Sequence, residues 1–161
     1  MDHSLKYAKN VNLEHACGNH SGNLEYMLVR DIKKYYKTIK ENRVTVNLHN
    51  DYRVAYKLGN VGIMMSHGDT VPLKRLPGIF AKEYAVLWGS CESHEVHTGH
   101  KHNKFVEQEI DGVVMRQFPT PKVEKRQTHG EYEERGGYIS RKMIQLIEYN
   151  EDNSKVIYEI G

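Results

Sequence analysis

The sequence predicts an α/β fold built around a mixed sheet, and three observations lead to this prediction. Short alternating or continuous apolar segments, typical of strands, recur at 11–16, 44–48, 61–65 and 95–98. Apolar residues at three- and four-residue steps between positions 24 and 39 predict a long helix. The length of 161 residues suits one compact domain, so we expect a single domain over 1–161.

The first part of the chain reads as a strand followed by this helix. The strand runs over 11–16 and leads into Gly18-Asn19-His20, and Ser21 is a suitable N-cap for the helix after it. The helix is amphipathic, with an apolar stripe formed by Leu24, Met27, Leu28, Ile32, Tyr35 and Ile39. Lysines at 33, 34, 37 and 40 lie largely off the stripe, where a solvated face is the main interpretation and nucleic-acid binding the alternative.

The middle of the chain contains most of the predicted strands. Segments 44–48 and 52–56 flank Asn50-Asp51, which predicts a hairpin. The continuous apolar run 61–65 suits a strand covered on both faces. Segment 72–88 is expected to be helical, or a loop followed by a helix, with an interruption at Pro77-Gly78, and a further strand is expected over 95–98.

Two antiparallel pairs are predicted towards the C-terminus. Asp111-Gly112 between 105–110 and 113–118 is a strong two-residue hairpin signal. The polar segment 119–137 predicts a long loop, either solvated or lying over a site as a lid. Segments 138–149 and 155–160 predict two strands that close a second antiparallel sheet.

Composition restricts the classes of protein that fit. The formal net charge of +2 permits a phosphate-bearing substrate without requiring nucleic acid. Cys17 and Cys91 form no CxxC pair, so we expect neither a disulfide framework nor a thiolate zinc site, and a reducing cytoplasm fits best. No apolar stretch is long enough to cross a bilayer, which predicts a soluble protein without a membrane partner. Ten histidines, four of them at 94, 97, 100 and 102, indicate a metal site or proton chemistry.

Three loops that follow predicted strands carry the polar groups suited to chemistry. They are Gly18-Asn19-His20, His67-Gly68-Asp69 and Gly99-His100-Lys101-His102. Ligand sites in α/β sheets form where the carboxyl ends of strands meet, so we expect the loops to converge. In an extended chain, His100 and His102 point to the same side, where they would serve one metal or two neighbouring ones.

The ordered motifs GNH, SHGD and GHKH resemble those of the calcineurin-like metallophosphoesterase superfamily, and in particular the phage and prophage phosphoesterases. The resemblance covers nearly the whole chain and implies a mixed-sheet sandwich with a two-metal centre for hydrolysis of phosphomonoesters or phosphodiesters. It implies that Asn19 binds one metal and the phosphate, and that His67 and His100 bind the same metal. It further implies that His102 binds the second metal and that His20 protonates the leaving alkoxide. Mn, Fe, Zn and Ni all suit such ligands.

The sequence departs from the family pattern in two places. Ser21 stands where the family usually has an acid that orients the preceding histidine. The upstream DxH and GD motifs are absent, because only seventeen residues precede Gly18, so we expect a partial domain without its N-terminal strands. Such a chain is expected to form a homo-oligomer or to associate with a separate N-terminal half. Its substrate would be a phosphoester, including a nucleotide or nucleic acid. The alternatives are a non-catalytic histidine metal-binding domain and a subunit that complements the missing half.

Overall fold

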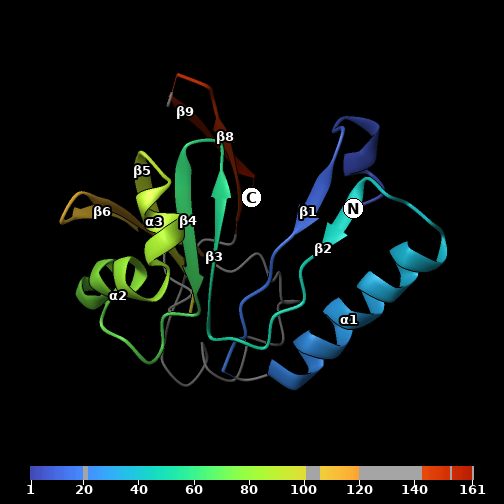
Figure 1. Ribbon diagram of the computed structural model, residues 1–161, viewed down its shortest axis with the longest axis horizontal. Helices are drawn as coiled ribbons and strands as arrows, with labels where there is room; N and C mark the ends of the chain where they lie inside the picture. The colour runs from blue at the N-terminus through green and yellow to red at the C-terminus, as the bar shows by residue number, and fades with distance from the viewer. Residues whose placement is uncertain (20–21, 101–105, 120–142, 153, 161) are drawn as a thin grey trace, which may run out of the picture. The chain divides into compact units, whose positions relative to one another are not determined.

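The structure, a computed structural model, describes residues 1–19, 22–100, 106–119, 143–152 and 154–160 (Figure 1). It is a mixed α/β protein, and its chain divides into two compact units. The first unit consists of Met1–Val54 and Met65–His67, and the second of Ala55–Met64 and Gly68–Gly161.

The first unit is a βαβ arrangement preceded by a short 3-10 helix, η1 (Ser4–Lys6). Strand β1 (Val11–Leu13) and strand β2 (Val44–Val46) pair in parallel, and α1 (Gly22–Thr38) connects them. The predicted hairpin at Asn50-Asp51 is therefore wrong. Strand β2 pairs with a strand more than thirty residues earlier, and the chain then leaves this sheet. Periodicity alone could not reveal a partner so distant in sequence.

Helix α1 buries a different side from its predicted apolar stripe. Its inward residues are Val29 and Tyr36, which are seven positions apart and so lie on one face. The stripe lies on the adjacent face, where Leu24 is 71% and Leu28 is 61% exposed. An amphipathic stripe normally packs against a core, but here the residues that pack are the smaller apolar set beside it.

Most residues of the five-stranded sheet belong to the second unit. Its order is β3-β4-β5-β7-β6, formed by β3 (Arg53–Leu58), β4 (Val61–Ser66), β5 (Ser93–Thr98), β7 (Val113–Gln117) and β6 (Val106–Ile110). As predicted for the run 61–65, β4 is a central strand and is buried over its first four residues.

Strand directions make the sheet mixed. The two-residue turn at Gly59 and Asn60 makes β3 and β4 antiparallel. The carbonyl of Asn60, just before β4, accepts a hydrogen bond from the N–H of Glu92, just before β5. At the other end of these strands, the backbone of Gly68 lies against Thr98, so β4 and β5 run in the same direction. Strand β7 is parallel to β5, and β6 is antiparallel to β7.

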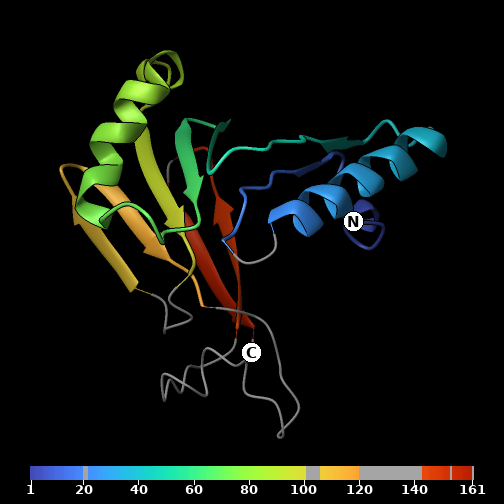
Figure 2. The same cartoon turned by 90° about the horizontal axis from the view of Figure 1, so that it is seen from below.

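Helices cover one face of this sheet, as Figure 2 shows. The core combines Met64, Val96 and Met115 from three strands with Leu76 and Phe80 from α2 (Leu76–Glu83). These five side chains are almost completely inaccessible to water, so they hold the helical layer on the sheet by apolar burial.

The expected interruption at Pro77-Gly78 is wrong. The 3-10 helix η2 (Leu73–Arg75) leads directly into α2, and Pro77 lies in the first turn of α2. Proline is tolerated there because first-turn N–H groups have no intrahelical partner. The helical segment breaks instead at Tyr84, before α3 (Ala85–Gly89).

The predicted C-terminal pairs are present. Asp111 and Gly112 both have positive φ, 51° and 77°, as the turn between β6 and β7 requires. Strands β8 (Ile144–Tyr149) and β9 (Lys155–Ile160) form the second antiparallel sheet. The predicted loop at 119–137 lies outside the described residues except for Pro119, and so does the start of the predicted strand 138–149. No helix in the described part of the chain is long and apolar enough to cross a membrane.

Candidate functional site

Two of the three predicted motifs follow neighbouring parallel strands. Strand β4 ends at Ser66 and is followed by His67-Gly68-Asp69, whereas β5 ends at Thr98 and is followed by Gly99-His100. Gly68 has a φ of 94°, and a Cβ atom placed on it would lie 3.1 Å from the Cβ of Thr98. The backbone of the loop after β4 thus packs directly on Thr98, the last residue of β5, and this close approach requires glycine at position 68.

The backbone at His100 turns sharply. Its φ of 66° lies in the left-handed region, which is uncommon for any residue other than glycine. The alternation rule that would point His100 and His102 to the same side does not apply at His100, because the chain there is not extended. His102 itself lies outside the described residues.

The backbone just before Asn19 is held by hydrogen bonds within the first unit. The N–H of Gly18 donates a 2.9 Å hydrogen bond to Oε2 of Glu25 in the first turn of α1. The N–H of Cys17 donates to the carbonyl of Asp51 at 3.2 Å, and burial raises the pKa of the Cys17 thiol. Asn19 follows these anchors in an exposed turn. His20 lies outside the described residues.

The predicted metal ligands that the structure describes are divided between the two units. Asn19 belongs to the first unit and His100 to the second, while His67 is assigned to the first unit and immediately precedes Gly68 of the second. Within the described ranges, no three His, Cys, Asp or Glu side chains gather closely enough to hold a metal ion. The ligand assignments therefore stay predictions.

Sequence reasoning missed a buried carboxylate, Glu95, at the centre of a polar cluster in the second unit. Oε2 of Glu95 lies 2.8 Å from Nε2 of His97, accepts a 2.9 Å bond from Nε of Arg116 and accepts a 2.8 Å bond from the Tyr149 hydroxyl. Its Oε1 accepts from Nζ of Lys155. Burial opposes the charge of Glu95, but these four contacts hold the pKa of its carboxyl well below the ordinary range.

This cluster attaches the β8-β9 sheet to the face of β5 opposite the helices. Val96 faces the helical core, so its neighbours Glu95 and His97 point to the other face. Tyr149 ends β8 and Lys155 begins β9. A glutamate flanked by histidines in a short strand gave no signal of burial, because three of its four partners, Arg116, Tyr149 and Lys155, lie more than twenty residues away in sequence.

Several histidines outside the three loops have structural contacts in the described part of the chain. The ring of His94 stacks on Trp88 at 3.6 Å, and its Nε2 lies 2.9 Å from the Trp88 carbonyl oxygen. The ring of His97 packs edge-on against Phe118 at 5.0 Å. His49 lies 3.1 Å from Glu14 of the first unit. His94 and His97 thus take part in the packing of the second unit.

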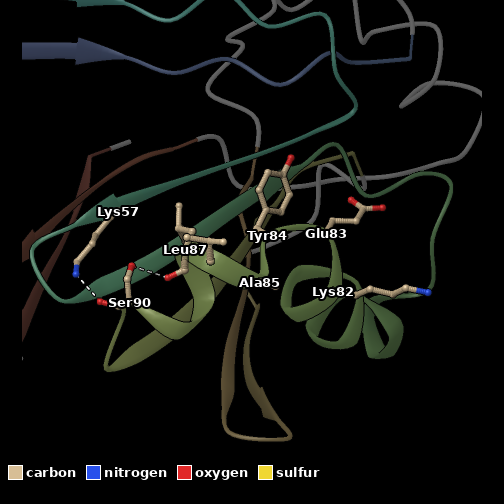
Figure 3. Close-up of a pocket in the computed structure, with 8 residues that line it drawn as sticks. Lys57, Lys82, Glu83, Tyr84, Ala85, Leu87 and Ser90 are labelled. Atoms are coloured by element: carbon tan, nitrogen blue, oxygen red, sulfur yellow. Dashed lines mark hydrogen bonds between the residues drawn. The ribbon is translucent and has the colours of Figure 1, made fainter.

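An open pocket of about 570 Å³ lies at the far end of β4 from His67. Figure 3 shows its lining, formed by Lys57, Lys82, Glu83, Tyr84, Ala85, Val86, Leu87 and Ser90. Lys57 reaches across to donate a hydrogen bond to the carbonyl of Ser90. None of the predicted site residues lines this pocket.

Comparisons of the chain with family models, curated proteins and solved structures gave no match.

Proposed function

We propose that this protein takes part in metal-dependent hydrolysis of phosphoesters, as the calcineurin-like metallophosphoesterases do. The observation that carries the proposal is the pair of histidine motifs after two neighbouring parallel strands, β4 and β5, at whose ends Gly68 packs on Thr98. The carboxyl ends of adjacent parallel strands are the usual place for ligand sites in α/β sheets. The first motif, at Asn19, joins the proposal through its sequence alone.

In this proposal, Asn19, His67 and His100 bind one divalent ion and His102 binds a second. Imidazole and amide donors suit Mn, Fe, Zn or Ni, so the donor chemistry of these side chains fits the group. Divalent ions, when bound, polarise a phosphate and supply hydroxide at neutral pH.

Two further roles, contact with the substrate and proton transfer, are assigned to side chains of the first motif. Asn19 lies in an exposed turn, and its amide is assigned contact with the substrate phosphate. His20 is assigned the role of general acid, which donates a proton to the leaving alkoxide. A phosphomonoester or phosphodiester fits this scheme, including a nucleotide or nucleic acid.

The proposal extends to a metallophosphoesterase-type sandwich. Its support is the layering of the second unit, in which helices lie on one face of β5 and the β8-β9 sheet contacts the other through Glu95. In such a sandwich the ligand loops follow the carboxyl ends of the strands of the sheet, and His100 follows the end of β5.

The test combines metal content with turnover. Wild type and His100→Ala would be reconstituted with Mn²⁺ and assayed for bound metal by elemental analysis and for hydrolysis of bis-p-nitrophenyl phosphate. We expect His100→Ala to lose metal and turnover, and His3→Ala, which removes an exposed histidine outside the motifs, to keep both. Wild-type metal content and turnover in His100→Ala would refute the proposal.

A second candidate is a metal-binding subunit that is active only together with another chain. The exposed apolar residues of α1 favour it, because Leu24 and Leu28 belong to a contiguous apolar stripe of the kind that marks interaction surfaces. This candidate predicts metal binding without turnover by the isolated chain, and self-association in light scattering. A monomer at micromolar concentration would contradict the self-association.

A further inference from the structure

The carboxylate of Glu25 is placed to control the loop that carries Asn19. Glu25 lies in the first turn of α1, where the positive end of the helix dipole favours an acidic side chain. Its Oε2 accepts the hydrogen bond from the N–H of Gly18, the residue immediately before Asn19. The same oxygen lies 3.5 Å from Nε2 of the largely buried His15. One carboxylate thus contacts the segment at two points, three residues apart.

Packing at Gly18 shows how close this contact is. A Cβ atom on Gly18 would lie 3.1 Å from Oε1 and 3.3 Å from Oε2 of Glu25, so the carboxylate fills the space that a side chain would need. The backbone is also held one residue earlier, where Cys17 donates to the carbonyl of Asp51. Two consecutive N–H groups before Asn19 are therefore fixed, and Glu25 supplies one of the two fixing contacts.

We infer that Glu25 is a positioning residue that fixes the backbone at Gly18 and thereby presents Asn19 to the metal. The inference rests on the proposed function, in which Asn19 is a ligand. Glu25 acts through a hydrogen bond to the backbone, so the acceptor oxygen matters and the negative charge does not. Groups that orient metal ligands typically change metal affinity by about 10- to 100-fold when they are removed.

Four variants of the full chain separate this role from others. Glu25→Ala removes the acceptor, whereas Glu25→Gln keeps an amide oxygen for Gly18 and removes only the charge. Asp31→Ala is the matched control, because it removes the same charge from the same helix at a side chain that is 62% exposed. Asn19→Ala reports independently on the ligand itself.

Two readouts are measured: exchange of the Gly18 amide hydrogen in the metal-free chain, and Mn²⁺ affinity by calorimetry. We expect Glu25→Ala to accelerate exchange at Gly18 and to weaken Mn²⁺ binding about 10- to 100-fold. Glu25→Gln and Asp31→Ala should match wild type in both. Circular dichroism checks that Glu25→Ala folds, and if it does not, Glu25→Gln decides, with wild-type values supporting the inference.

The failing outcomes are distinct. Loss of affinity in Asn19→Ala with wild-type affinity in Glu25→Ala overturns the inference and leaves the proposed function standing. Loss of affinity in Glu25→Gln equal to that in Glu25→Ala also overturns it, because charge would then be the cause. Unchanged affinity in Asn19→Ala, or no Mn²⁺ binding by wild type, overturns the proposed ligand role and the inference with it.

Discussion

Replacing Glu95 with alanine should destabilise the second unit more than any substitution of an exposed acid. Glu95 is fully buried and is bonded to Arg116, Tyr149, Lys155 and His97. Its removal takes from Arg116, whose side chain is only 3% exposed, the carboxylate that lies with it in the interior, while the contact with the half-exposed Glu107 stays. Breaking a buried ion pair from one side typically costs about 3–5 kcal/mol of unfolding free energy.

The assay is urea unfolding at pH 7, followed by circular dichroism. A typical domain has an unfolding free energy of about 5–15 kcal/mol, so the expected loss is a large fraction of the total. Glu107→Ala is the matched control, because Glu107 also bonds Arg116 but is 46% exposed, and exposed pairs contribute about 0–1 kcal/mol. Equal losses in Glu95→Ala and Glu107→Ala would refute the argument from burial.

The same cluster predicts how stability depends on pH. Burial raises the pKa of Glu95, but its hydrogen bonds outweigh burial and leave the folded-state pKa below the unfolded value of about 4.3. The unfolded chain then binds the extra proton, so the contribution of Glu95 is complete above this pH and is lost as the pH falls below it. Urea unfolding at pH 7 and pH 4 should show a smaller acid-induced loss in Glu95→Gln than in wild type. An identical loss would contradict the assignment.

Two further predictions concern single positions outside this cluster. Gly68→Ala should lower the melting temperature, because alanine is strained at a φ of 94° and its Cβ would press on Thr98. The control Gly89→Ala, at an unobstructed helical position, should leave the melting temperature equal or higher. Equal melting temperatures for the two variants would contradict this prediction. Hydrogen bonds from Arg43 lower the pKa of Glu41 to about 2. NMR titration should therefore give a Glu41 pKa well below the ordinary value in wild type and an ordinary pKa in Arg43→Met. A low Glu41 pKa in both proteins would exclude Arg43 as the cause.

Local signals in the sequence were sufficient for several elements. Asp111-Gly112 predicted the β6-β7 hairpin because its turn needs positive φ at two successive residues, which this pair tolerates well. The apolar run at 61–65 predicted an interior strand because a strand covered on both faces has apolar residues on both of its sides. Both signals depend on neighbouring residues alone.

Contacts with residues distant in sequence decided strand pairing and helix burial, which the hydrophobic pattern alone did not predict. The pairing of β2 with β1 overrode a plausible hairpin at Asn50-Asp51, since parallel pairing depends on a strand on the far side of α1. The buried side of α1 was likewise set by packing within its unit, which selected Val29 and Tyr36.

For the candidate site, too, some features followed from the sequence and others only from the tertiary structure. The sequence by itself identified the side chains that we propose as metal ligands, Asn19, His67 and His100 among them, because motif and residue type are local properties. Only the tertiary structure decided that β4 and β5 are parallel neighbours, that Glu25 reaches back to Gly18, and that Glu95 is buried. The physical reason is that burial and hydrogen bonding depend on which distant segments meet, and a single sequence does not record those contacts.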